Sequence, residues 1–235
     1  MILIYLAAGR GSRLPKKFRN NPKCLVKIKN ETLFGRNKDF FNFFKKKIII
    51  TGYKKNKLEK LARKMNFKII YNKYYFKTNM VYSMFLAKRQ ITEDVVICYG
   101  DIIFDKKIIK ILRYTKNILP VNINWLNYWK KRMSYKKILN DAEELKIQKG
   151  KITQIGGKIM NKFPKYQFLG IIKFKKETFF NLSKFFNSQN QKIDMTSFLN
   201  KCISEKILNL NATKYKNFWH EIDENKDIII AETSK

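Results

Sequence analysis

Short apolar runs alternate with longer amphipathic stretches through the first half of the chain. The runs predict strands over residues 2–7, 47–51, 67–71 and 95–99. The stretches between them repeat apolar positions at helical spacing and predict helices over residues 33–44, 54–65 and 79–90. Thr78 stands where it would cap the last of these helices. Strands and helices in alternation indicate a mainly parallel sheet that helices cover on both faces.

The second half of the chain repeats these signals less regularly. We expect strands over residues 121–125, 168–174 and 207–212, and a hairpin of residues 144–148 and 152–155 around Lys149-Gly150. We expect helices over residues 125–133, 176–186, 195–206 and 225–232. No repeat or low-complexity linker divides the sequence, and 235 residues with 45% hydrophobic content can bury a full core. We therefore predict a single domain over residues 1–235.

The turn after the first predicted strand carries the strongest chemical signal. Its residues are, in order, Leu6, Ala7, Ala8, Gly9, Arg10, Gly11, Ser12 and Arg13. Gly9 and Gly11 can adopt positive φ, which lets successive N–H groups converge on phosphate oxygens. Arg13, and Lys23 after Pro22, add a guanidinium and an ammonium for the same oxygens. The segment lacks the Gly-Lys-Ser/Thr of a Walker loop and the third glycine of the dinucleotide fingerprint, so we expect a different triphosphate-binding loop. An ordinary connection from strand to loop is the alternative.

Two carboxylates follow strand-like segments. Asp101 comes directly after Gly100 at the end of the strand predicted over residues 95–99, and Asp223 follows residues 218–222. Ligands of open α/β sheets bind at the carboxyl ends of the strands, and a pair of carboxylates there suits Mg²⁺. The alternative is structural, because Asp101 could cap a helix that starts near Asp105, and Asp223 could cap the terminal helix.

The glycine turn with Pro22-Lys23 resembles the signature of nucleotidyltransferases that activate sugar phosphates and related molecules. The sequence matches the cytidylyltransferases that activate phosphocholine, 2-aminoethylphosphonate or phosphoglutamine better than it matches the hexose-1-phosphate enzymes. This match extends over Tyr71-Asn72, residues 78–83, Trp125 with Trp129 and Arg132, residues 141–143, Ile155-Gly156, Gln167 with Gly170 and Ile171, residues 194–197 and residues 219–223. The sequence departs from the family at Pro15-Lys16-Lys17 in the loop and at Tyr166 before Gln167. The resemblance implies a three-layer α/β fold of GT-A type with a mainly parallel, mixed sheet.

The resemblance also implies roles for individual residues. Lys23 and Arg13 would be catalytic, and Asp101 and Asp223 would bind Mg²⁺. The nucleotide would be bound by Leu6, Ala7, Ala8, Gly9, Gly11, Ser12, Asn79, Ser83 and Tyr99. The acceptor would be bound by Trp125, Trp129, Asp141, Glu143, Gln167, Asp194 and Trp219. The two tryptophans lie four residues apart and can share a helix face, where aromatic rings and acids suit an amine head; the alternative is that the tryptophans are core and the acids are solvated.

The reaction implied is transfer of CMP from CTP to a small phosphorylated or phosphonate acceptor, with release of pyrophosphate. A hexose-1-phosphate nucleotidyltransferase that uses UTP, GTP or dTTP is the alternative within enzymes. His220, the one histidine of the sequence, is expected to pack against Trp219, because this reaction needs no general base.

A net charge of +33 raises the alternative of a nucleic-acid-binding protein. Only eight of the 51 basic residues are arginine, and the lysines occur in nearly every segment, which favours solvated lysines over a nucleic-acid groove. The three cysteines, Cys24, Cys98 and Cys202, are too few and too far apart for a disulfide framework, so we expect free thiols. No run is long enough to span a membrane and no signal peptide is recognisable, so we expect a cytoplasmic protein.

Overall fold

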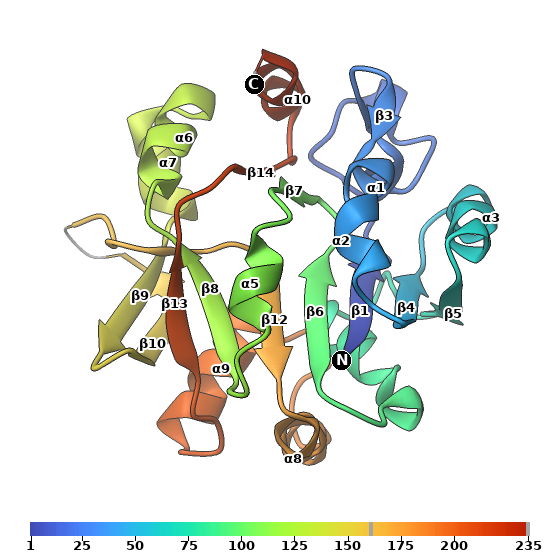
Figure 1. Ribbon diagram of the computed structural model, residues 1–235. Helices are drawn as coiled ribbons and strands as arrows, with labels where there is room; N and C mark the ends of the chain where they lie inside the picture. Colours follow the sequence, from blue (N-terminus) through green and yellow to red (C-terminus); the bar gives the residue numbers. More distant parts are fainter. Residues whose placement is uncertain (160–161, 234–235) are drawn as a thin grey trace.

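A ten-stranded sheet forms the centre of the computed structural model, which describes residues 1–159 and 162–233 (Figure 1). Its strands are, in spatial order, β5 (Phe67–Tyr71), β4 (Lys46–Thr51), β1 (Ile2–Ala7), β6 (Val95–Tyr99), β12 (Ile171–Phe174), β8 (Ile118–Asn122), β13 (Asn211–Tyr215), β10 (Lys151–Lys158) and β9 (Glu143–Gln148), with β11 (Gln167–Phe168) on β8. Strands β5, β4, β1 and β6 run parallel, and β12 lies antiparallel to β6 and β8. The sheet is therefore mixed, as the resemblance implied.

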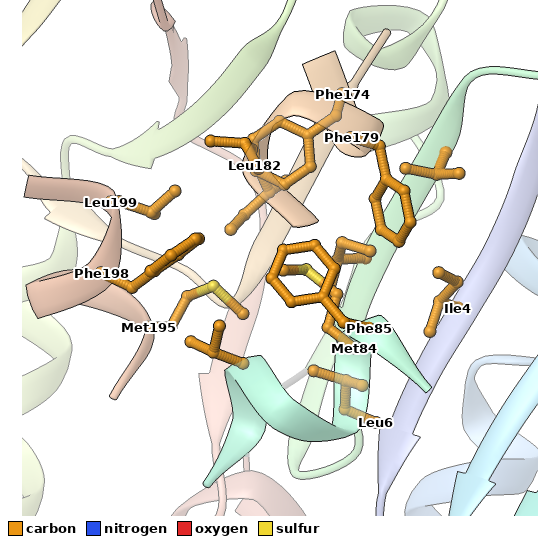
Figure 2. Close-up of a cluster of buried hydrophobic side chains, with 14 of the residues drawn as sticks. Ile4, Leu6, Met84, Phe85, Phe174, Phe179, Leu182, Met195, Phe198 and Leu199 are labelled. Carbon is orange, nitrogen blue, oxygen red and sulfur yellow. The ribbon is translucent and has the colours of Figure 1, made fainter. Parts of the chain in front are cut away.

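Helices cover both faces of the sheet, and β1 alternates its side chains between the two cores that lie there. Ile2, Ile4 and Leu6 enter one core with α4 (Met80–Phe85), α8 (Lys176–Phe186) and α9 (Met195–Ser204), which Figure 2 shows around Phe85. Leu3, Tyr5 and Ala7 enter the other with α1 (Leu33–Arg36), α2 (Lys38–Asn42), α3 (Asn56–Lys64), α5 (Ile108–Leu112) and α6 (Trp125–Arg132). All six residues of β1 are buried, which explains why the first strand reads as a continuous apolar run.

A second layer of short elements lies beyond the carboxyl ends of β1 and β6, at the top of Figure 1. It contains the antiparallel pair β7 (Ile102–Phe104) and β14 (Trp219–Glu221), the pair β2 (Lys27–Ile28) and β3 (Glu31–Thr32), and the helices α7 (Tyr135–Asp141) and α10 (Asn225–Thr233). Single 3₁₀ turns occur at η1 (Lys16–Phe18), η2 (Lys23–Leu25) and η3 (Lys88–Gln90). A small apolar cluster around Ile103, Ile222 and Ile228 holds this layer together.

Most predicted elements are confirmed, and the differences have local causes. The helix expected over residues 33–44 is two helices, because Asn37 turns inward and donates its side-chain amide to the Ile102 carbonyl at 2.9 Å. Asn79, not Thr78, caps α4, since its Oδ1 accepts the Met80 N–H while the Thr78 hydroxyl donates to the Tyr74 carbonyl. The strand expected over residues 168–174 is divided at Gly170, which has φ +83°.

The prediction was wrong at β13, which spans Asn211–Tyr215 where we expected residues 207–212, and at β8, which spans Ile118–Asn122 where we expected residues 121–125. It missed β2, β3, β7 and α7. The hairpin of β9 and β10 turns at Lys149-Gly150 as expected, with φ +47° and +76°. Cys24, Cys98 and Cys202 are buried free thiols. Among the described helices, none combines the length and the apolar character that crossing a bilayer requires.

Candidate active site

The glycine loop and Asp101 lie side by side because β1 and β6 are parallel neighbours that end together. Leu6 of β1 is paired with Tyr99 of β6, so the two chains leave the sheet at the same edge. Gly100 permits this approach: a Cβ there would lie 2.6 Å from the Leu6 carbonyl oxygen. The expectation that the glycine turn and the aspartate share one edge of the sheet is therefore confirmed.

Four charged side chains meet at this edge; we call Arg13, Lys23, Asp101 and Asp223 the Lys23 cluster. The ammonium of Lys23 lies 2.8 Å from Asp101 Oδ2 and 2.5 Å from Asp223 Oδ1. Arg13 Nη2 lies 2.7 Å from the same Asp223 oxygen. The Lys23 and Asp223 side chains are 13% and 4% exposed, whereas Arg13 is 60% exposed and can reach outward to a ligand.

The pairing of β7 with β14 brings Asp223 to Asp101. Glu221 lies opposite Ile102, and the Ile222 N–H donates to the Asp101 carbonyl at 2.9 Å. Asp227, in the first turn of α10, accepts the N–H groups of Asp223 and Glu224 at 2.7 and 2.8 Å. Strand pairing and a helix cap thus hold the Asp223 backbone through contacts that are separate from those of its side chain.

The charges within the cluster depend on one another. Burial alone would lower the pKa of Lys23, but Asp101, Asp223 and Glu221 outweigh it and raise that pKa above its usual range. Burial would likewise raise the pKa of Asp223, but Lys23 and Arg13 hold it below its usual value. Burial and the neighbouring Asp223 and Asp101 raise the pKa of Glu221 to about 8.

These carboxylates could also hold a metal ion. One oxygen each from Asp101, Glu221 and Asp223 lies within 4.8 Å of the others. Asp101 Oδ1 is buried and accepts no hydrogen bond from the described part of the chain, so it is available to a cation. Carboxylate oxygens are the ligands that Mg²⁺ prefers in proteins, and the residues present therefore fit this ion.

Two adjoining cavities of about 140 and 50 Å³ open beside the glycine turn, and together we call them the loop cavity. The predicted nucleotide-binding residues that line it are Leu6, Ala7, Ala8, Gly9, Asn79, Ser83 and Tyr99. Lys23 and Asp101 line it as well. Gly11 and Ser12 do not: Gly11, at φ +66°, packs on the Lys23 stem, and Ser12 faces solvent. Gly9 lies outside the positive-φ region, contrary to our expectation for it.

A larger cavity of about 290 Å³ lies on the other side of Tyr99 and Met80, which line both spaces. We call it the acidic cavity. The predicted acceptor-binding residues that line it are Trp129, Asp141, Glu143, Gln167, Asp194 and Trp219. Arg13 and Asp223 also line it, so the Lys23 cluster lies between the two cavities.

Trp125, which we expected to bind the acceptor, does not line the acidic cavity. Its side chain lies in the apolar core at 1% exposure, and its indole N–H donates to the Pro164 carbonyl at 3.2 Å. It does share a helix face with Trp129, and the two rings meet edge to face at 5.1 Å. One turn of α6 thus separates a core position from a cavity position.

The sequence analysis assigned no role to three residues of this site, although Arg132 and Glu221 lie in segments that match the family. Arg132 is 4% exposed and lies 2.8 Å from Asp227, 3.4 Å from Asp223 and 3.6 Å from Glu221. Glu221 adds a third carboxylate to the pair that we expected. Gly52 lies against the glycine turn, because a Cβ at position 52 would lie 2.6 Å from the Ala8 carbonyl oxygen. Only the family match singles out Arg132 and Glu221 in the sequence, and no sequence signal marks Gly52.

Two alanine substitutions should separate the folding of this edge from ligand binding. Gly100→Ala places a methyl group against the Leu6 carbonyl, and we expect it to cost about 3 kcal/mol of unfolding free energy. Gly9→Ala meets no atom within 4 Å, so it should change stability by less than about 0.5 kcal/mol while weakening ligand binding in the loop cavity. Urea unfolding measures the change in stability, and ligand titration measures the change in binding. Equal losses of unfolding free energy in Gly100→Ala and Gly9→Ala would contradict the packing argument.

His220 gives the protein a defined response to acid. We expected its ring to pack on Trp219, but its ring contacts among the described residues are with Tyr128, stacked at 4.1 Å, and with Phe218 at 4.6 Å. Burial, together with Arg132 and Lys131, lowers its pKa from 6.5 to about 4. The unfolded chain therefore binds this proton below about pH 6.5 and the folded chain only near pH 4. Stability is fully present above pH 6.5, and about 3 kcal/mol is lost as the pH falls towards 4.

The variant His220→Phe keeps an aromatic ring and removes the titration. We expect its urea midpoint to depend less on pH than that of the parent between pH 6.5 and 4, and His220 is the sole histidine that could cause the difference. If the urea midpoints of the two proteins change equally with pH between 6.5 and 4, the acid response does not come from His220.

Comparison with known proteins gives consistent matches. The sequence family described as the MobA-like NTP transferase domain matches residues 3–117. The CTP:phosphoglutamine cytidylyltransferase of Campylobacter jejuni is 30% identical over an alignment 251 positions long, which covers 97% of this chain and 98% of that protein. The bifunctional protein GlmU of Methanococcus maripaludis is 27% identical over 234 residues, 98% of this chain and 53% of that protein. The solved CTP:phosphocholine cytidylyltransferase of Streptococcus pneumoniae shares the fold, with a TM-score of 0.75 at 18% identity over 98% of this chain and 97% of that one.

Proposed function

The chain belongs to the nucleotidyltransferase family of the Campylobacter jejuni CTP:phosphoglutamine cytidylyltransferase, and we propose that it transfers CMP from CTP to a small phosphorylated or phosphonate acceptor. The observation that carries this proposal is the position of the Lys23 cluster. Lys23 and Asp101 line the loop cavity, Asp223 lines the acidic cavity, and their ion pairs join the two spaces. A nucleotide in one cavity and an acceptor in the other would meet at this cluster.

The reaction is an in-line displacement at the α-phosphorus of CTP. An oxygen of the acceptor's phosphate or phosphonate forms a new bond to this phosphorus. The bond from the α-phosphorus to the oxygen that bridges to the β-phosphate breaks, and pyrophosphate leaves with the electron pair. The attacking oxygen is already anionic at neutral pH, because the second ionisation of a phosphate ester has a pKa of about 6. No general base is required, which fits the packed position of His220.

The obstacle to this reaction is repulsion between two anions. A unit charge pair about 4 Å apart is worth about 4 kcal/mol at an effective dielectric constant near 20. Lys23, fixed between two carboxylates, and the exposed Arg13 supply positive charge at the place where the anions meet. The main chain from Ala7 to Gly9 would bind the base and ribose, with Asn79, Ser83 and Tyr99, which line the same cavity.

We propose Mg²⁺ as the cofactor, held by Asp101 and Asp223 with Glu221 beside them. When bound, this ion would neutralise phosphate charge and help to position the reacting oxygens. Asp101 Oδ1 has no donor among the described residues and the β7–β14 pair holds the carboxylates together, whereas Asp223 would exchange a contact with Lys23 or Arg13 for the ion. The cytoplasmic location stays a prediction.

The acceptors of the proposed class are phosphocholine, 2-aminoethylphosphonate and phosphoglutamine. The second candidate is a nucleotidyltransferase for hexose 1-phosphates that uses UTP, GTP or dTTP, because solved structures of similar fold include a UDP-glucose pyrophosphorylase and a putative glucose-1-phosphate thymidylyltransferase. Pyrophosphate release from CTP, UTP, GTP and dTTP, each paired with these three acceptors and with glucose 1-phosphate, tests both. We expect release with CTP and one of the nitrogen-containing acceptors; preferred release with glucose 1-phosphate would replace the first function by the second. No release with any pair, together with binding of nucleic acid that does not need Asp101, would remove both.

A further inference from the structure

Both oxygens of Asp223 are already in contact with cations of the protein. Its Oδ1 lies 2.5 Å from the Lys23 ammonium and 2.7 Å from Arg13 Nη2. Its Oδ2 lies 3.4 Å from Arg132 Nη2. Asp101, the other residue proposed to hold Mg²⁺, places its Oδ2 2.8 Å from the same ammonium. An ion that binds Asp223 must therefore compete with at least one of these side chains.

The charges around the two aspartates are balanced without an ion. Asp101 and Asp223 carry two negative charges, and Lys23 and Arg13 place two positive charges against them. A divalent ion added to this set would bring two more positive charges into a partly buried site, where like charges repel more strongly than in water. The balance is kept only if a cation of the protein withdraws when the ion binds.

Lys23 is the cation whose withdrawal relieves both aspartates. Arg132 is fixed in place, because its side chain is 4% exposed and its Nε lies 2.8 Å from Asp227. Arg13 is 60% exposed and shares Asp223 with Lys23, so its departure alone would leave the ammonium against both aspartates. The departure of the ammonium removes one contact from each of them at once.

The Lys23 side chain can turn into the loop cavity without moving its backbone. Lys23 lines the part of this cavity that measures about 50 Å³, together with Gly9 and Asp101. The inner part of the side chain is held, since a Cβ on Gly11 would lie 3.2 Å from Lys23 Cβ and Cγ. The backbone is held by the Val26 N–H, which donates to the Lys23 carbonyl at 3.0 Å. Only the outer bonds of the side chain need to rotate.

We propose that the Lys23 ammonium and Mg²⁺ exchange places. In the metal-free protein the ammonium neutralises Asp101 and Asp223, and in the metal-bound protein it turns into the loop cavity, towards the phosphates of the nucleotide. This inference rests on the proposed function, whose metal site and cationic side chain it couples. Lys23 then sets how tightly the ion binds. Because such coupling is reciprocal, an anion that holds the ammonium in the loop cavity also strengthens metal binding.

Binding of Mn²⁺ to the protein without nucleotide or acceptor tests the exchange. Mn²⁺ prefers the same oxygen ligands as Mg²⁺, and its electron paramagnetic resonance signal measures the free ion. Lys23→Met keeps a side chain of similar length and removes the competing charge, so we expect its Kd for Mn²⁺ to be about 10-fold lower than that of the parent. Lys23→Arg keeps a competing charge and should bind Mn²⁺ no more tightly than the parent. Unchanged or weaker binding by folded Lys23→Met would overturn the inference.

Two controls assign the effect to this site. Lys27→Met removes an exposed lysine from β2 and should keep the Kd within about 2-fold of the parent value. The double variant Lys23→Met/Asp101→Asn should lose the tighter binding, and retention of it would place the ion elsewhere and overturn the inference. If Lys23→Met is unfolded in metal-free buffer, Mn²⁺ should restore its circular dichroism. No recovery at concentrations that saturate the parent would also overturn the inference.

Kinetics distinguishes competition from a loss of structure. Lys23→Met should have a lower kcat than the parent and yet reach half of its maximal rate at about 10-fold lower Mg²⁺, whereas a distorted site would need more Mg²⁺. Tighter Mn²⁺ binding by Lys23→Met, without pyrophosphate release by the parent from any nucleotide, would support the exchange and contradict the proposed function. Release by the parent that requires Mg²⁺, with equal Mn²⁺ binding by the two proteins, would support the proposed function and contradict the exchange.

Discussion

Replacing Lys23 by alanine is expected to lower kcat about 10²- to 10³-fold, which is the cost of removing one preorganised charge from a transition state. The ammonium is 13% exposed and is held by Asp101 and Asp223 at 2.8 and 2.5 Å, so it is already located between the two cavities from which the anions would approach. Pyrophosphate release at saturating substrates measures the effect. Lys23→Arg keeps the charge in a larger, planar group and should recover part of the rate.

Lys27→Ala is the matched control for this substitution, because Lys27 is an exposed lysine four positions later in the short strand β2. We expect its kcat to remain within about 2-fold of the parent value, since an exposed cation in water interacts weakly with distant charges. Urea unfolding of both variants shows whether the folded protein is intact at the assay temperature. Full activity in Lys23→Ala would remove this residue from the mechanism.

The sequence identified those parts of the site that lie next to each other along the chain or directly at a strand end. The glycine turn and Asp101 could be predicted because parallel strands such as β1 and β6 deliver their carboxyl ends to one edge. Asp223 could be assigned only through a family resemblance, because its approach to Asp101 depends on the pairing of β14 with β7. Nothing in the local pattern of either strand specifies that partner.

The burial of individual side chains is the other property that could not be predicted from the sequence. Arg132 matches the family pattern, but its place after two lysines in a chain with 51 basic residues does not show that its side chain is 4% exposed among acidic side chains. Trp125 and Trp129 are equivalent by helical spacing, yet one enters the core and the other lines a cavity. Their environments are set by the segments packed against α6, including Pro164 and β14, which come later in the chain.

The second large effect is expected on stability, from Asp227→Ala. Asp227 is 2% exposed, lies 2.8 Å from Arg132 Nε and accepts the N–H groups of Asp223 and Glu224. Alanine would leave a buried guanidinium with fewer partners and two backbone donors without acceptors. Removing one member of a buried ion pair costs about 3–5 kcal/mol, which lowers Tm by about 10 °C in a chain of this size. Lys226→Ala, one position earlier and exposed, should change stability by less than about 0.5 kcal/mol.

Two further variants divide this loss into its parts. Asp227→Asn keeps an oxygen for the two backbone N–H groups and removes the charge opposite Arg132, so it should lose less stability than Asp227→Ala. The double variant Arg132→Met/Asp227→Ala removes the guanidinium that the single change strands, and its loss should be about 1–3 kcal/mol smaller than the sum of the two single losses. Strictly additive losses would mean that the pair is not coupled, and that Asp227 acts through the backbone of residues 223–224 alone. Because Asp223 is held by that backbone and by Arg132 together, a coupled pair also means that the position of Asp223 between the two cavities depends on both residues.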